Sequence, residues 1–259
     1  ELDAMRPSML GNLILAAGRN GDRGFDDVAL FEVGPQFRDA TPKGQDFVAA
    51  GLRRGRDNRR HWAETPRPVD AYDAKADALA VLEAIGAPTA SIQIATEAPG
   101  WYHPVRSAVM RLGPKNVLAA FGEIHPRILD RMDVTGPMVA FEVFIDNAPL
   151  PKAKATRNRA ELLVSDLPSV QRDFAFVVDE ATTADSIVRA AKGADKAFIG
   201  DVNVFDIYAG KGIEDGKKSV AITARLAPKD ATLTDPEIEA IAAKIVAAVA
   251  KATGAVLRG

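Results

Sequence analysis

The order of strand-like and helix-like segments in the C-terminal part of the chain is the sequence feature that most constrains its fold. Alternation of apolar and polar residues indicates strands, and apolar residues every three or four positions indicate helices. Six segments follow one another as strand, helix, strand, strand, helix and strand: 172–179, 183–195, 198–210, 217–227, 233–254 and 255–259. This order predicts a ferredoxin-like domain, in which two helices cover one face of an antiparallel sheet and leave the other face open.

Alternation along the hairpin assigns its side chains to the two faces of this sheet. The helix-covered face is expected to hold Phe205, Ile207, Val220 and Ile222. The open face is expected to hold Val204, Asp206, Tyr208, Ser219, Ala221 and Thr223. In the first strand, Phe174 and Phe176 would face the helices and Ala175 the open side, but the reverse assignment also fits, because both sets are apolar.

Three residues expected on the open face suggest contact with a nucleic-acid base. Tyr208 can stack an unpaired base, an interaction that contributes about 1–3 kcal/mol per base. The carboxylate of Asp206 can accept hydrogen bonds from the N1–H and N2–H groups of guanine, and the hydroxyl of Ser219 can meet a base edge, a ribose or a phosphate. The small side chain of Ala175 would leave room for the base. A purely structural interpretation fits equally well: Tyr208 covers the sheet and Asp206 pairs with a lysine of the next loop.

The first 150 residues predict an α+β unit with a largely antiparallel sheet, because strand segments are interspersed with helices without regular β-α alternation. Helices are expected at 8–20 and 70–88, a short helix at 125–133, and strands at 28–39, 47–55, 91–96, 107–113, 117–124 and 138–146. The segment APLPKAKATRNR mixes prolines with basic residues and is typical of a linker. We therefore expect a first domain at 1–150, a linker at 151–164 and the ferredoxin-like domain at 165–259.

Composition and motifs give little support for catalysis. The chain has no cysteine, which excludes thiol nucleophiles and thiolate metal sites and fits a reducing cytoplasm, where we expect the protein to act. His61, His103 and His125 are far apart in sequence, so we expect no metal-binding residues and no catalytic residues. No phosphate-binding glycine motif is present, because AGKGIEDG joins two strands instead of opening a helix. No apolar run reaches the roughly 18 residues of a membrane helix.

Charge leaves nucleic-acid binding open. A net charge of −2 argues against general coating of nucleic acid. The run RRGRDNRRH at 53–61 and the basic residues of the linker (Lys152, Lys154, Arg157 and Arg159) either are solvated or contact RNA phosphates. The pattern does not distinguish these two interpretations.

Several segments resemble the C-terminal part of the bacterial phenylalanyl-tRNA synthetase β chain. Its ferredoxin-like anticodon-binding domain is similar to LPSVQRDFAFVVD, VFDIYAGKGIEDGKKSVAI and LTDPEIEAIAAKIVAAVAKATGAVLRG. Its catalytic-like module is similar to MRPSMLGNLILAAGRN, VALFEVGPQFRD, YDAKADALAVLEAIG and YHPVRSAVMRLGPKNVLAAFGEIHP. The segments keep their order and cover essentially the whole chain. Two positions depart from the family pattern: Gly11-Asn12 replaces a common proline-glycine, and Val105 stands where glycine is usual.

The resemblance implies a fold and a function. The fold would be a class II synthetase-like antiparallel sheet with helices, followed by the ferredoxin-like domain. The whole enzyme would be an α2β2 tetramer that uses ATP and Mg²⁺ to attach phenylalanine to tRNA(Phe), with the active site in the α chain. The partners would be tRNA(Phe) and the α chain, without a membrane or DNA. Tyr208 would stack on the first anticodon base, a guanine, Asp206 and Ser219 would hydrogen-bond to it, and Ala175 would lie close to it.

The resemblance also implies that the first domain is not catalytic. Active class II synthetases hold ATP with an arginine of motif two and an arginine in a glycine-rich strand-to-helix motif three. The hairpin at 28–55 resembles motif two, with Arg38 near its tip, but VAFEVFIDNAPLP at 139–151 contains neither glycine nor arginine. We therefore expect no cofactor in this chain. The alternative function is a ferredoxin-like regulatory or interaction module that does not bind RNA.

Overall fold

The chain forms two compact units, Glu1–Thr156 and Arg157–Gly259. The computed structural model describes residues 4–149, 167–228 and 231–258. The predicted linker at 151–164 and its basic residues lie outside the described residues. Both units combine helices with antiparallel sheets, so the predicted α+β class is confirmed.

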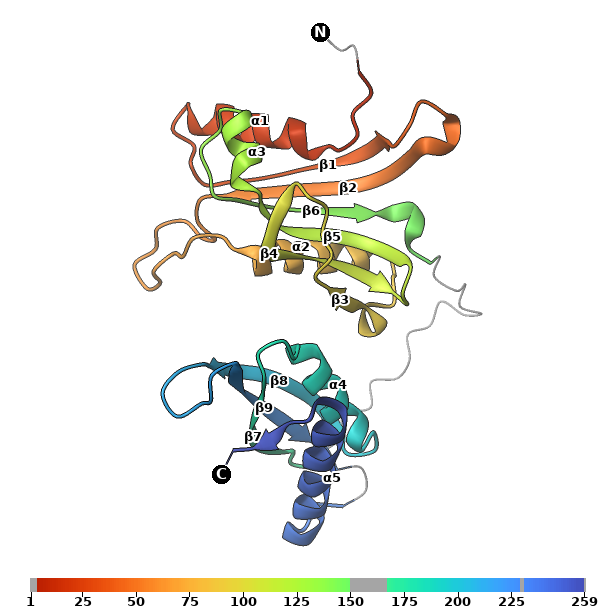
Figure 1. The fold of residues 1–259 in the computed structure, drawn as a ribbon, viewed down its shortest axis with the longest axis vertical. Helices are drawn as coiled ribbons and strands as arrows, with labels where there is room; N and C mark the ends of the chain where they lie inside the picture. The colour runs from red at the N-terminus through yellow and green to blue at the C-terminus, as the bar shows by residue number, and fades with distance from the viewer. Residues whose placement is uncertain (1–3, 150–166, 229–230, 259) are drawn as a thin grey trace. The chain divides into compact units, whose positions relative to one another are not determined.

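The first unit is built on one six-stranded antiparallel sheet with the strand order β1-β2-β6-β5-β4-β3 (Figure 1). Its strands are β1 (Val28–Phe37), β2 (Gln45–Arg54), β3 (Gln93–Ala95), β4 (Tyr102–Leu112), β5 (Asn116–Ile124) and β6 (Met138–Phe144). Its helices are α1 (Leu10–Gly21), α2 (Ala71–Ala84) and α3 (Pro126–Arg131), with short 3₁₀ turns η1 (Pro42–Gly44), η2 (Thr89–Ser91) and η3 (Ile145–Asn147). The predicted hairpin at 28–55 is therefore present as β1 and β2.

Helices cover both faces of this sheet, which explains the nearly continuous apolar composition of its central strands. Ala50 and Leu52 of β2 belong to the core under α1, whereas Ala49 belongs to the core under α2. The start of α2 is fixed by a capping box, in which Asp70 accepts from the backbone and Asp73 accepts from the Asp70 N–H.

The second unit has the predicted β-α-β-β-α-β order and is ferredoxin-like. Its elements are β7 (Val170–Asp179), α4 (Ala184–Ala194), β8 (Ile199–Tyr208), β9 (Lys217–Leu226), α5 (Asp235–Thr253) and β10 (Val256–Leu257). The sheet order is β10-β7-β9-β8, and all its pairs are antiparallel. The helices α4 and α5 lie against each other and against one sheet face (Figure 1). At the end of α5, Gly254 adopts φ +69°, a left-handed conformation that favours glycine.

The helix-covered face contains Phe174 and Phe176, both buried, so this assignment is settled in the direction first expected. Val220 and Ile222 of β9 are also fully buried in this core. Ala175 and Ala221, which pair with each other, therefore lie on the opposite side of the sheet, which we call the open face.

The predicted alternation along β8 is wrong at Val204 and Phe205, whereas Ile207 keeps its predicted helix side because it pairs with the buried Val220. Val204 pairs with Ile222 and packs on the helix side, whereas Phe205 is 59% exposed and does not belong to the core. The physical reason is a shift in register: Val204 pairs with Ile222 but Asp206 pairs with Ala221, so Phe205 is an extra residue in a β-bulge. Beyond the bulge, Asp206 and Tyr208 lie on the open face, as the alternation predicts.

Candidate nucleic-acid interface

The open face of the C-terminal sheet is organised in rows of residues that lie opposite one another on neighbouring strands. One row consists of Val177, Ser219 and Tyr208, the next of Ala175, Ala221 and Asp206, and the third of Asp173, Thr223 and Asn203. Side chains directly opposite each other have Cβ atoms about 4.5–5.5 Å apart. The four predicted site residues therefore occupy two adjacent rows, and the register of the strands brings them together.

The middle row provides a floor of small side chains beside a carboxylate. Ala175 and Ala221 are partly exposed and project only a methyl group from the sheet. Asp206, at the end of this row, is exposed on the edge strand β8. A flat ring could lie over the two alanines with its edge toward Asp206.

The Asp206 carboxylate is not engaged by the lysines of the following loop. The Nζ of Lys217 forms an ion pair with Glu214 at 2.6 Å, and the Nζ of Lys218 donates to the carbonyl oxygen of Glu180 at 2.8 Å. Within the part of the chain that the structure describes, no group donates a hydrogen bond to the Asp206 side chain. Both carboxylate oxygens are thus free to accept hydrogen bonds from a ligand, which disfavours the purely structural interpretation of this residue.

Tyr208 lies next to Asp206 on the open face and is anchored by its hydroxyl. The side chain is 40% exposed, and the Oη donates to the carbonyl oxygen of Lys211 at 3.2 Å. Gly210 permits this position, because a Cβ at residue 210 would lie 3.0 Å from the Tyr208 Oη. The ring is held at the edge of the sheet with a part of its surface accessible.

Ser219 is less accessible than the sequence suggests. Its exposure is only 4%, although it lies on the open face between Val177 and Tyr208. These larger neighbours flank it on both sides. Its hydroxyl would therefore contact a base only if the Tyr208 ring moved aside.

The bulge residue Phe205 was missed as a surface residue because strict alternation assigns it to the core. The sequence does carry a signal: the apolar residues Val202 and Val204 alternate in one phase, and Phe205 and Ile207 alternate in the other. A change of phase by one residue within a strand indicates a bulge.

In the first unit, the arginine that resembles the ATP-binding residue of motif two is already paired. The Nε of Arg38 donates to Asp46 Oδ2 at 2.7 Å, and its Nη2 donates to Asp46 Oδ1 at 3.0 Å. Such a two-pronged pair satisfies the guanidinium fork that would otherwise hold a phosphate. The strand β6, at the position of motif three, leads into the short turn η3.

A buried carboxylate on β6 serves the structure of the first unit. Glu142 is fully buried and accepts hydrogen bonds from Ser8 Oγ at 2.6 Å, Trp101 Nε1 at 3.1 Å and the Tyr102 hydroxyl at 3.3 Å. Burial raises the pKa of Glu142, and the three hydrogen bonds oppose this shift. Because every donor comes from the protein, this network fastens the N-terminal segment to the sheet.

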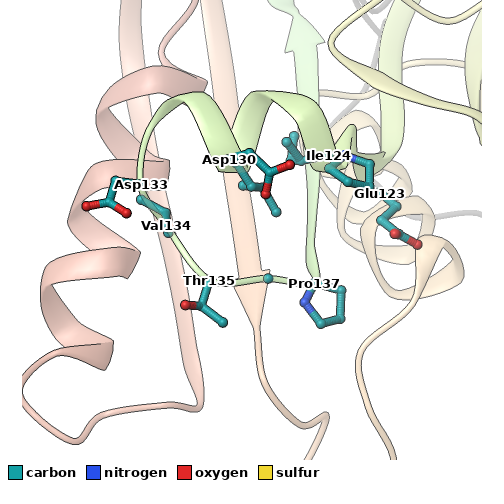
Figure 2. Close-up of a pocket in the computed structure, with 10 residues that line it drawn as sticks. Glu123, Ile124, Asp130, Asp133, Val134, Thr135 and Pro137 are labelled. Atoms are coloured by element: carbon teal, nitrogen blue, oxygen red, sulfur yellow. The ribbon is translucent and has the colours of Figure 1, made fainter.

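The pocket around α3 has the wrong charge for a phosphate or a nucleic acid. It has a volume of about 540 Å³, and Glu123, Asp130 and Asp133 contribute carboxylates to its lining (Figure 2). Glu123 pairs with Arg106, whose Nη2 lies 2.8 Å from Glu123 Oε1. Over the described ranges, no group of three or more acidic or histidine side chains could hold a metal ion.

The three histidines and two arginines of the arginine-rich run have local structural partners. The Nδ1 atoms of His61, His103 and His125 each accept a backbone N–H two residues further along the chain. In the arginine-rich run, Arg53 pairs with Asp77 at 2.6 Å, and Arg54 donates to the carbonyl oxygen of Ala17. Among the described residues, no helix is long and apolar enough to cross a membrane.

Comparisons with known proteins match both units. The family of ferredoxin-fold anticodon binding domains matches residues 165–258 of the chain. The family of phenylalanyl tRNA synthetase beta chain CLM domains matches residues 1–145. Phenylalanine–tRNA ligase beta subunits are 55% identical in Rhodospirillum rubrum, 56% in Paramagnetospirillum magneticum and 52% in Bradyrhizobium diazoefficiens. Each alignment covers 100% of this chain and 32% of the relative, so the chain spans about a third of the length of these relatives.

Proposed function

Because the chain belongs to the family of phenylalanine–tRNA ligase beta subunits, we propose that it is the tRNA-binding and subunit-assembly portion of such a subunit. The first part, 1–150, is the catalytic-like module, and residues 165–259 are the anticodon-binding domain. Residues 151–164 link them. The proposed boundaries are supported by the matches of the two family models, which end at residue 145 and begin at residue 165.

The whole enzyme, in this proposal, attaches phenylalanine to tRNA(Phe) with ATP and Mg²⁺ in the cytoplasm. It is an α2β2 tetramer whose α chain performs the chemistry, and the β chain binds tRNA and takes part in assembly. The relatives are phenylalanine–tRNA ligase beta subunits, which supports the ligase activity, and the similarity of the second domain to an anticodon-binding family supports tRNA as the nucleic-acid partner.

This chain itself supplies no catalytic residue in the proposal. The pairing of Arg38 with Asp46 supports this, because an ATP phosphate would have to displace a two-pronged ion pair. The network at Glu142 supports it further, because its hydrogen bonds come from Ser8, Trp101 and Tyr102 of the same unit.

The anticodon is read on the open face of the C-terminal sheet. Tyr208 stacks on the first anticodon base, a guanine, while Asp206 accepts hydrogen bonds from its N1–H and N2–H groups. Ala175 forms the floor, and Ser219 contacts the base once Tyr208 rotates. The observation that carries this assignment is the exposed Asp206 carboxylate, which no described residue engages and which lies beside Tyr208 above the two alanines. A hydrogen-bond acceptor next to an accessible aromatic ring suits an unpaired guanine.

The test is a titration of the chain with the anticodon stem-loop of tRNA(Phe). We expect Tyr208→Ala to weaken binding about fivefold or more, because stacking contributes about 1–3 kcal/mol per base. Replacement of the first anticodon guanine should weaken binding to the unaltered protein. Tyr72→Ala is the matched control, because Tyr72 is an exposed tyrosine of the first unit. Equal binding of both loops by the unaltered protein and by Tyr208→Ala would contradict the proposal and favour a module without RNA binding.

A further inference from the structure

The β-bulge in β8 exposes an aromatic side chain next to the proposed anticodon site. Phe205 is the residue inserted between Val204, which pairs with Ile222, and Asp206, which pairs with Ala221. Bulges occur often at sheet edges and next to binding sites, where they redirect a side chain. The strand β8 is an edge strand, so its outer side is not covered by another strand of the sheet.

Exposure and position place Phe205 on the open face. Counted forward from Val204, which packs on the helix side, the next residue falls on the open face. Alternation counted back from Asp206 would instead put Phe205 on the helix side. This alternative is excluded because Phe205 is 59% exposed and is not part of the apolar cluster under α4 and α5. Both residues of a bulge oppose one residue of the partner strand, here Ala221, so Phe205 borders the same alanine floor as Asp206.

An exposed phenylalanine beside this site has the chemistry of a base-stacking platform. The side chain offers a flat apolar face and no hydrogen-bonding group, so it can hold any base without selecting among them. Phe205 and Tyr208 are three residues apart, at most about 10 Å along a strand. This separation leaves room for a first base at Tyr208 and Asp206 and for a second base beside it.

We propose that Phe205 stacks the base next to the one held by Tyr208, so that the open face binds two unpaired bases. This inference rests on the proposed anticodon-binding function and extends it. The two aromatic residues have different roles: the base at Tyr208 is identified by Asp206, whereas the base at Phe205 is held without base-specific hydrogen bonds.

The test uses the 259-residue chain and the same anticodon stem-loop, with binding followed by fluorescence anisotropy. The variants are Phe205→Ala, Phe205→Leu, Tyr208→Ala and the matched control Ile207→Ala. Ile207 is equally exposed on the same strand, but it pairs with the buried Val220 and so belongs to the helix side. Thermal unfolding of each variant verifies that the second unit still folds.

We expect Phe205→Ala and Phe205→Leu each to weaken binding about fivefold or more, and Ile207→Ala to bind as the unaltered protein does. Loops that lack one base should then separate the two platforms. On a loop without the base held by Phe205, Phe205→Ala should bind as the unaltered protein does, whereas Tyr208→Ala should still bind more weakly. The reason is that a substitution removes no binding energy when the base that its side chain contacts is already absent.

The inference would be overturned, with the proposed function left intact, if Phe205→Ala bound normally while Tyr208→Ala bound more weakly. Full binding by Phe205→Leu, or loss of both effects on the same base-deleted loop, would overturn it in the same way. Equal weakening by Ile207→Ala would also overturn it, because the effect would then not be specific to the open face. Normal binding by Tyr208→Ala would instead refute the proposed function, and the inference with it.

Discussion

The stability of Phe205→Ala tests whether β8 contains the bulge, because a bulged strand and a regular strand bury Phe205 to different extents. Phe205 is 59% exposed, so about two-fifths of its surface is removed from water by folding. Complete burial of a phenylalanine side chain contributes about 1.5–3 kcal/mol, and this fraction of it corresponds to about 1 kcal/mol. A loss of that size lowers the melting temperature of a domain of about 100 residues by about 4–8 °C.

A regular strand would give a much larger effect. With Phe205 in the core, as strict alternation predicts, its replacement by alanine would cost about 3–5 kcal/mol and at least about 12 °C. Phe176, which is fully buried in the same unit, provides the reference for a core phenylalanine. The assay is thermal unfolding followed by circular dichroism, and Phe176→Ala identifies the transition that belongs to the second unit. A decrease for Phe205→Ala as large as that for Phe176→Ala would refute the bulge.

Three further predictions concern the rest of the chain. Burial raises the pKa of Glu142 above its ordinary 4.5, so the folded state binds this proton more tightly than the unfolded state does. The free energy of unfolding should therefore fall as the pH rises from 4.5 through the raised pKa. Measured by urea unfolding, Glu142→Gln should lose less stability over this pH range than the unaltered protein. Gly122→Ala should destabilise the first unit by about 2–5 kcal/mol in thermal unfolding, because Gly122 has φ +149° and the new Cβ would lie 2.4 Å from Ser107 Cβ. Gly113→Ala is the control: Gly113 has φ +66° but open space around it, so this change should cost only about 1–2 kcal/mol. Tyr208→Phe should bind the stem-loop within about twofold of the unaltered protein, because only an exposed hydrogen bond is lost and stacking persists.

Much of the fold could be predicted from local patterns. The helices and strands of the second unit follow from apolar periodicity, and their order restricts the topology to a ferredoxin-like sheet. The hairpin of β1 and β2 and the helix α2 were predictable for the same reason. The pattern could not decide whether Phe174 and Phe176 face the helices, because Ala175 and Val177, which alternate with them, are also apolar. The packing of α4 and α5 decides it.

The candidate site was predictable only in part. The positions of Asp206, Tyr208 and Ser219 on one face follow from alternation, because all three lie on the same side of the bulge in the hairpin. The orientation of Phe205 depends on a one-residue register shift, which strict alternation cannot represent. Ser219 is buried between Val177 and Tyr208, and the hydroxyl of Tyr208 bonds to the next loop. Such side-chain contacts are tertiary and leave no periodic signal.

The most direct test of guanine recognition by Asp206 is a double-mutant cycle between protein and RNA. The protein change is Asp206→Asn, and the RNA change is inosine in place of the first anticodon guanine, which removes the N2–H donor. We expect the unaltered protein to bind the inosine loop more weakly than the guanine loop, and Asp206→Asn to bind the two loops almost equally. The difference between these two effects, the coupling energy, should be about 1.5–3 kcal/mol, as is typical of hydrogen bonds to charged groups. The same inosine effect in both proteins would contradict recognition of the guanine by this carboxylate.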